Sequence, residues 1–363
     1  MKTHYFFYLV LMDMLINIMV YVPDILFEDR FNGAIMSMLL TIPLSTTLAY
    51  LLSIGLMKFP GMGLPEIFKL TFPVWIRTPV LIYLGINWSI GVWIALTNFA
   101  ILAKRYINPD LSLVAVLLFF LAVVGWGAVQ NSRTVLYVTE IITLLNVPLI
   151  FFIMIKAFTS SYMRWKEIFS MGAFAFNWPT WSSLSAATYL FNGYIEMVIL
   201  HREFEGKFTT KYHWIIPIMG LLSFITTFAV PIGFHGLMAV GDYPYPWVVT
   251  ADSMRFKLGF VERVVFVFLL LYIGISIMYG IVAWHNSIEL LKGAFEKTIK
   301  GQWQRYFPWI LLALLAIPPC YAVELIDQPK LLQFSRLWLN SRLAGEIALV
   351  LTVYLLGRWR KTA

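Results

Sequence analysis

The chain is a succession of long apolar segments separated by short polar connections. A helix needs roughly 20 apolar residues to cross the hydrocarbon core of a bilayer, and uncharged runs of that order recur along the whole sequence. The pattern predicts about ten membrane-spanning helices, at residues 5–26, 34–57, 79–103, 111–130, 134–157, 182–200, 214–236, 260–291, 306–323 and 343–357.

Composition agrees with this pattern, since 60% of the residues are hydrophobic, 13% are charged and the mean hydropathy is +0.78. These values exclude an ordinary soluble domain. We therefore expect an all-α, polytopic membrane protein whose first apolar segment is a retained helix and not a signal peptide. The connections are short, so residues 1–363 are predicted to form a single integral membrane domain. Its parts would be a first five-helix repeat (1–166), most of a second repeat (167–330), and a last helix with the C-terminal tail (331–363).

Two of the predicted spans are irregular. The sixth is interrupted by Asn192 and Gly193, with Glu196 following within a turn, and the first has Asn17 a little before Pro23. Irregular backbone inside a bilayer is tolerated only where it is buried in protein or lines a wet cavity. Each irregular span is the first of its five-helix half. This correspondence predicts a five-plus-five inverted-repeat transporter fold with broken helices one and six and a small-solute site between them.

Charge and cysteine content narrow the function further. The net charge of +8 is spread over the loops, which suits contact with anionic lipid headgroups and gives no basic tract for nucleic acid. The only cysteine, Cys320, and the five scattered histidines do not have the spacing of a metal site. No phosphate-binding loop, dinucleotide fingerprint or nucleophile elbow is present. We therefore expect no enzyme activity, no cofactor and no metal.

Three blocks of residues carry a resemblance to a known family. They are FPGMGLPEI at 59–67, FNGYIE at 191–196, and the segment 245–277, which contains FVER at 260–263. The chain resembles the B subunits of spore germination receptors, a branch of the amino acid–polyamine–organocation transporter superfamily. It departs from that family in the first span, where Ile16 and Ile18 replace a Gly-x-Gly pair, so it resembles a divergent member. Either its ligand differs from a typical amino acid or recognition has weakened.

The resemblance implies a membrane-embedded sensor. It would bind a small nutrient, commonly an amino acid, in the inner membrane of a dormant spore. It would then signal to a larger membrane subunit and a lipoprotein, triggering germination. The alternative is a proton- or sodium-coupled amino acid transporter of the same superfamily, and a third hypothesis is a scaffold that has lost ligand binding.

Candidate site residues follow from these spans. Asp13 and Glu140 are candidates for an ion or proton site, because an ionisable group inside a span is expensive unless it has a use or a partner. Glu262 and Arg263, with the aromatic loop 241–257, are expected at an interface with a partner subunit. Candidate ligand-binding residues lie in spans one, three, six and eight: Ile16, Asn17, Ile18, Asn87, Phe191, Asn192, Gly193, Glu196, Tyr272 and Ser276.

Overall fold

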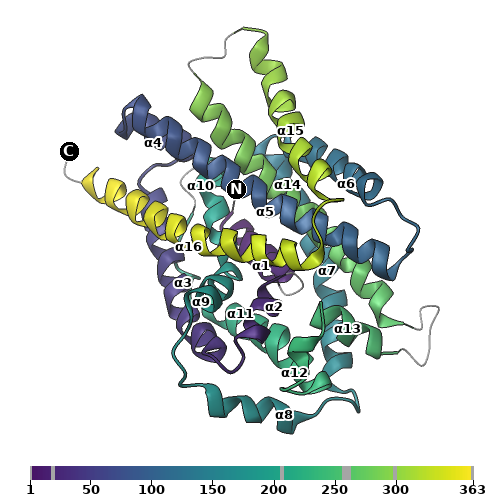
Figure 1. The fold of residues 1–363 in the computed structure, drawn as a ribbon. Coiled ribbons are helices and arrows are strands. Elements are labelled where there is room, and N and C mark those ends of the chain that lie inside the picture. The colour runs from purple at the N-terminus through teal and green to yellow at the C-terminus, as the bar shows by residue number, and fades with distance from the viewer. Residues whose placement is uncertain (1, 18–20, 205–207, 256–262, 297–300, 361–363) are drawn as a thin grey trace.

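A computed structural model describes residues 2–17, 21–204, 208–255, 263–296 and 301–360 (Figure 1). Ile18 and Glu262, both predicted site residues, lie outside these ranges. In chain order the α-helices are α1 (His4–Asn17), α2 (Tyr21–Glu28), α3 (Ala34–Leu56), α4 (Leu64–Thr71), α5 (Val74–Tyr106), α6 (Leu113–Ala128), α7 (Ser132–Phe158), α8 (Trp165–Ser170), α9 (Trp181–Tyr189), α10 (Met197–Leu200), α11 (Ile215–Phe224), α12 (Val230–His235), α13 (Pro246–Ser253), α14 (Val264–Phe295), α15 (Trp303–Ala322) and α16 (Gln328–Trp359). Between or beside them lie the 3₁₀ turns η1 (Met171–Phe174), η2 (Asn192–Glu196), η3 (His201–Phe204) and η5 (Val240–Asp242), and the π-helical turn η4 (Ile225–Ala229).

The predicted all-helical, multi-pass fold is confirmed. Within the described ranges, seven helices are long and apolar enough to cross a membrane, and α1 with α2 makes an eighth if this pair, bent by 59°, counts as one span. The two remaining predicted spans correspond to α6, which is shorter, and to the broken element α9–η2–α10. The division of the chain into two repeats at residue 166 stays a prediction.

Helix starts along the chain have ordinary local causes. The Thr180 hydroxyl accepts a hydrogen bond from the Ser183 N–H at the start of α9. The Asp327 carboxylate does the same for the Lys330 N–H at the start of α16. Such N-caps satisfy backbone donors that a helix leaves free in its first turn. They set where these two helices, which both contribute residues to the candidate site, begin.

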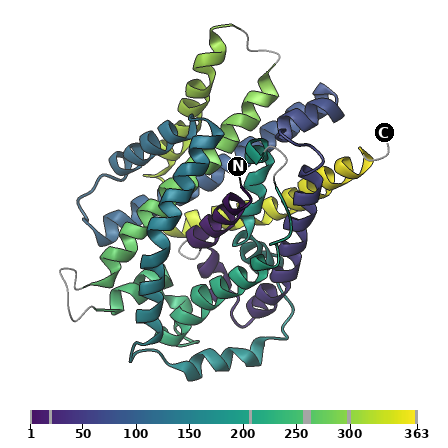
Figure 2. The same cartoon turned by 180° about the vertical axis from the view of Figure 1, so that it is seen from behind.

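Helix α1 lies at the centre of the bundle, and ten of its fourteen residues are buried. Around it, α3, α9 and α16 pack against one another, while α14 packs against α5, α6 and α7. The two views agree that the N-terminus lies near the middle and the C-terminus at the edge (Figures 1 and 2). Helix α4 lies toward one end of the bundle and α8 at the opposite end (Figure 1). The centre of the bundle is therefore formed by α1 together with the break between α9 and α10.

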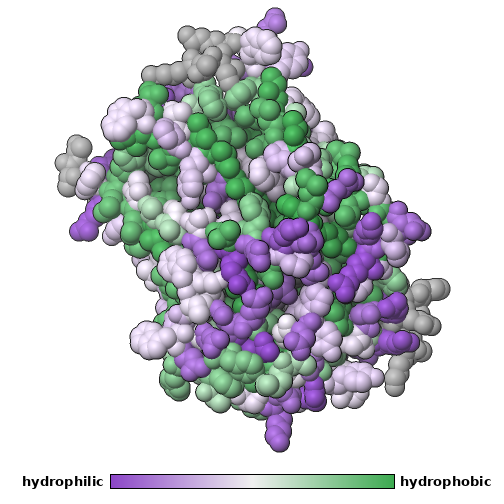
Figure 3. Space-filling view, viewed as in Figure 1, coloured by the Kyte–Doolittle hydropathy of each residue, from purple (hydrophilic) through white to green (hydrophobic). Residues whose placement is uncertain are grey.

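The outer surface is apolar over much of its area, as expected where lipid replaces water. On α7, Leu145, Phe151 and Ile155 are each more than half exposed. Figure 3 shows hydrophobic side chains over much of one face, with hydrophilic ones gathered around the beginning of α16. An exposed apolar area of this extent is unusual for a soluble monomer. The chain is a multi-pass membrane protein.

Candidate functional site

The sixth span is broken where the sequence predicts it. Helix α9 ends at Tyr189, the 3₁₀ turn η2 covers Asn192–Glu196, and α10 continues for one turn from Met197. Gly193 makes a close approach possible, because a Cβ atom there would lie 2.1 Å from the Leu9 carbonyl oxygen of α1. The two predicted irregular spans therefore touch backbone to backbone at Gly193. No solute has room at that point.

The Arg342 side chain of α16 occupies the carboxyl end of α9. Its Nη2 donates to the Ser185 carbonyl at 3.1 Å and to the Thr188 hydroxyl at 3.0 Å, and Nη1 donates to Asn192 Oδ1 at 2.8 Å. The guanidinium also lies 4.8 Å from the centre of the Tyr189 ring. A helix leaves its last carbonyls unpaired and carries partial negative charge at that end. Arg342 therefore places its positive charge against the last turns of α9 and bonds to Asn192, the first residue of η2.

Glu346, one turn further along α16, neutralises this guanidinium. Its carboxylate pairs with Arg342 Nη1 and accepts the Tyr194 hydroxyl of η2. The Arg342 and Glu346 side chains are 5% and 1% exposed, so the pair is fully buried. A buried ion pair is tolerated only when its hydrogen bonds are well satisfied, which these contacts provide.

Glu196 ends the 3₁₀ turn and has a different environment. Its carboxylate accepts the Trp88 indole N–H of α5 at 2.9 Å and the Asn286 amide of α14. Asn286 also donates to the Glu196 carbonyl at 3.1 Å. Glu196 is 1% exposed and forms no salt bridge with any described residue. A buried carboxylate whose only partners are neutral donors is costly as an unpaired charge, so it favours binding a proton or a cation.

A small cavity lies beside these charges, with a volume of about 30 Å³. Its polar lining is Asn87, Asn192, Glu196, Arg342 and Glu346, and its aromatic lining is Tyr83, Trp88, Tyr189, Tyr279 and Trp338. One water molecule needs roughly 10–15 Å³ measured in this way, so the cavity has room for roughly two. The space that this arrangement leaves is therefore smaller than an amino acid.

Asp13 of α1 lies close behind this cavity. It is fully buried, and neither carboxylate oxygen has a hydrogen-bond partner within the described residues. Glu196, Glu346 and Arg342 all lie within electrostatic range of it. The centre of the protein thus holds three carboxyl groups and a single guanidinium in close proximity.

The structure brings some of the predicted ligand residues together and separates others. Asn87, Asn192 and Glu196 line the cavity. Gly193 faces α1, and the Phe191 ring fills the space left by Gly220. A ligand-binding role for any of these residues stays a prediction.

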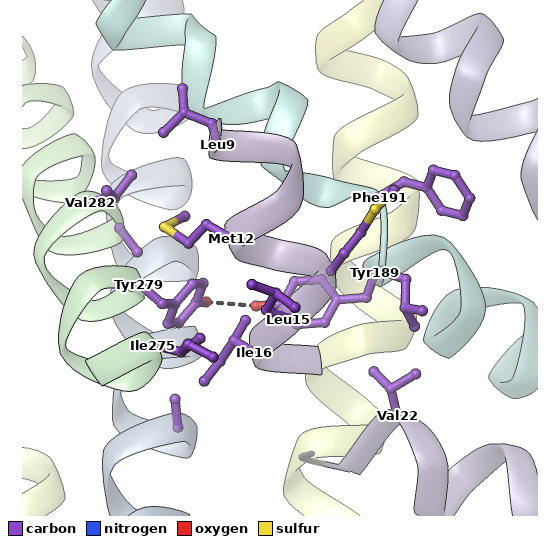
Figure 4. Close-up of a cluster of buried hydrophobic side chains, with 14 of the residues drawn as sticks. Leu9, Met12, Leu15, Ile16, Val22, Tyr189, Phe191, Ile275, Tyr279 and Val282 are labelled. Carbon is purple, nitrogen blue, oxygen red and sulfur yellow. Dashed lines mark hydrogen bonds between the residues drawn. The ribbon is translucent and has the colours of Figure 1, made fainter. Parts of the chain in front are cut away.

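Predicted residues of α1 and α14 lie away from the cavity lining. The Asn17 amide donates to the Tyr189 carbonyl at 3.1 Å, and Ile16 belongs to the apolar cluster drawn in Figure 4. The Tyr272 hydroxyl accepts from Asn98 at 3.4 Å, and the Ser276 hydroxyl is buried with no hydrogen-bond partner in the described part of the chain.

The remaining predicted residues have local partners. Glu140 of α7 accepts the Tyr5 hydroxyl at 2.6 Å and lies 3.8 Å from His4 Nε2. It therefore lies beside the beginning of α1 and apart from the cavity. Arg263 pairs with Asp252 across the loop between α13 and α14, with Nε 3.1 Å from Oδ1. This pair joins the end of α13 to the beginning of α14, and an interface role for Arg263 stays a prediction.

Sequence reasoning missed Arg342 and Glu346. The last span was predicted to begin at Leu343, directly after the arginine, whereas α16 begins at Gln328. A signal was present, since opposite charges four residues apart lie on one helix face and can pair there. The aromatic residues around the cavity carried no such signal, because rings are abundant throughout the chain.

One end of the bundle carries a network of ion pairs. Arg202 of η3 lies 2.6 Å from Glu289 of α14 and 3.4 Å from Glu66 of α4, and Lys292 lies 2.5 Å from Glu289. These residues line an open groove of about 430 Å³. The network links α4 and α14 to the segment that follows α10.

Within the described ranges, no group of three or more His, Cys, Asp or Glu side chains is placed to hold a metal ion.

Comparison with known proteins gives a likeness of fold. No protein-family model matches the sequence, and no curated protein matches it. Among solved structures, the chain resembles Mhp1, a nucleobase-cation-symport-1 family transporter in a closed conformation with bromovinylhydantoin bound. The TM-score is 0.50 at 12% sequence identity, and the alignment covers 92% of this chain and 74% of Mhp1. At this identity the likeness concerns the fold, which is that of a membrane transporter.

Proposed function

We propose that this protein is a membrane-embedded sensor that binds a small solute at the break of its sixth span without coupling to an ion gradient. The observation that carries the proposal is the position of Arg342. In transporters built from inverted repeats, the carboxyl ends of broken helices and the unwound carbonyls beside them coordinate the coupling cation. Here the chain's own guanidinium occupies the carboxyl end of α9. A permanently tethered cation cannot be released, so it cannot drive transport.

The contact between α1 and α14 supports the same proposal. Met12 and Ile16 of α1 face Ile275, Tyr279 and Val282 of α14 (Figure 4). A sodium ion requires several oxygen ligands, and this contact offers mainly hydrocarbon. The contact between the first broken span and α14 therefore also lacks the chemistry of an ion site.

The more specific assignment, a germinant-receptor B subunit in a spore inner membrane, rests on the resemblance of residues 59–67, 191–196 and 245–277. Under this assignment the ligand is a nutrient such as an amino acid. The partners are a larger membrane subunit and a lipoprotein, and the expected contacts are the outer loop 241–257 and the Glu262-Arg263 helix start. Binding would act by stabilising one arrangement of the helix bundle, which the partners then read.

One observation favours a second candidate, a proton-coupled transporter. Asp13 is buried in α1 with both carboxylate oxygens unpartnered. Titratable carboxyl groups in such positions mark proton pathways in pumps and transporters.

Uptake by the purified chain in liposomes separates the two candidates. The assay imposes either a pH gradient or a sodium gradient and follows a panel of radiolabelled amino acids, with binding to the same protein in detergent measured alongside. A sensor binds a solute but shows no accumulation above equilibrium under either gradient. Gradient-driven accumulation that Asp13→Asn abolishes, with the variant still folded, would establish the transporter instead.

A further inference from the structure

The cavity beside Glu196 combines a carboxylate that lacks a cation with walls of aromatic rings. Glu196 is held by Trp88 and Asn286, both neutral. The other carboxylate of the lining, Glu346, is already neutralised by Arg342. Positive charge is therefore attracted to Glu196, and the faces of tryptophan and tyrosine rings attract cations in addition.

The same lining offers little to an anionic group. The only cation in it is Arg342, and both of its terminal nitrogens are bonded to Glu346, Asn192 and the end of α9. Only its Nε–H is free of a hydrogen-bond partner in the described part of the chain. One N–H group cannot make the bidentate contact by which arginine recognises a carboxylate.

An apolar groove continues from the cavity toward the lipid. It has a volume of about 310 Å³ and lies between α5 and α16. Tyr83, Asn87 and Trp338 line both the cavity and the groove. Leu337, one of the other groove residues, is 70% exposed on the outer surface. The Trp338 indole N–H donates to the Asn87 carbonyl at 3.1 Å, which places this ring at the junction.

We propose that the site recognises a small organic ammonium ion that carries no carboxylate, with its charged head at Glu196 and its apolar part extending past Trp338 into the groove between α5 and α16. The proposal deepens the function proposed above and rests on it. The cavity has room for the ammonium head alone, so the carbon chain must lie where the groove provides space. Entry is from the side, through the bilayer, because the groove opens between two lipid-facing helices.

The test of the charge compares three probes of similar length: butylammonium, butan-1-ol and 4-aminobutanoate. Each is titrated calorimetrically into the full chain in detergent. We expect butylammonium to bind roughly tenfold or more tightly than the other two, since only it offers a positive charge without a negative one. Glu196→Gln keeps an acceptor for Trp88 and Asn286 but removes the charge, and should erase the preference. Glu140→Gln, the same change at a carboxyl group outside the cavity, should leave it intact.

The test of the groove uses alkylammonium ions of increasing chain length, with alkanols of equal length as the control for partitioning into detergent. Affinity should rise about fourfold for each methylene group that enters the groove. Ser341→Phe fills the groove from an exposed position and should flatten this dependence while ethylammonium still binds. Ala348→Phe places the same ring at an exposed position of α16 outside the groove. In this variant the rise of affinity with chain length should remain unchanged.

The outcomes distinguish the two proposals. Tightest binding of 4-aminobutanoate or of an α-amino acid, lost in Glu196→Gln, would overturn the ammonium assignment and leave the solute sensor standing. Charge dependence without chain-length dependence would overturn the role of the groove. Binding of neither amines nor amino acids by the folded protein would refute the solute sensor and the ammonium assignment together.

Discussion

Removing the guanidinium of Arg342 should destabilise the protein strongly. Arg342→Met keeps most of the hydrocarbon volume of the side chain but leaves Glu346 with only the Tyr194 hydroxyl, and leaves the end of α9 without its donor. Taking one partner from a buried pair typically costs about 3–5 kcal/mol, because the remaining charge stays buried and uncompensated. Since this pair is almost completely inaccessible to solvent, we expect a value in the upper part of that range.

The double variant Arg342→Met, Glu346→Leu removes both charges and should recover most of the loss. Replacing a whole buried pair by apolar residues of similar volume is often neutral or stabilising. The free energy of unfolding would be measured by titrating the detergent-purified proteins with sodium dodecyl sulfate, for the wild type, both single variants and the double variant. We expect a coupling energy of about 2–4 kcal/mol from this cycle. A double variant as unstable as Arg342→Met would refute the reasoning, because the loss would then come from packing and not from the unpaired carboxylate.

Two further predictions concern the backbone contact at the break and the pH dependence of stability. Gly193→Ala should lower the free energy of unfolding by about 1–3 kcal/mol or more, because the new Cβ would collide with the backbone of Leu9, whereas Gly172→Ala, with nothing within 4 Å, should be harmless in the same unfolding assay. Burial lowers the pKa of His213, which lies just before α11 and contacts the Ser53 hydroxyl of α3, from 6.5 to about 4. As pH falls, the unfolded chain therefore binds a proton at His213 before the folded protein does. The stability that comes from burying the neutral imidazole is complete above pH 6.5 and is lost between pH 6.5 and 4. In His213→Asn the melting temperature should depend less on pH between 6.5 and 4 than in the wild type. The same pH dependence in both proteins would show that His213 is not its source.

Sequence reasoning could locate the spans and the break because both depend on local composition. Long apolar runs specify membrane helices directly, and Asn192-Gly193 within such a run marks the one place where α9 cannot continue into α10. Glu196 could be identified for the same reason, as an ionisable group where none is expected.

The rest of the site depends on how the helices are rotated and where they cross. Trp88 and Asn286 meet Glu196 from α5 and α14, which lie 108 and 90 residues away along the chain. Nothing in their local sequence distinguishes them from the other rings and amides of the bundle. Arg342 was missed because a hydropathy window treats a charge as the end of a span, whereas here Glu346 and the end of α9 compensate it inside one.

The hydrogen bonds of Arg342 also indicate which parts of the protein move together. The guanidinium joins α16 to α9, and α3 packs against both, so we expect these three helices to move together. Helices α5, α6 and α7 form a second unit around α14. The 3₁₀ turn that ends in Glu196 is the joint between the units, with Tyr194 held by α16 and Glu196 held by α5 and α14. We therefore expect a ligand that binds Glu196 to act on the contact between these two groups of helices, so that filling a very small space changes how they are placed relative to each other.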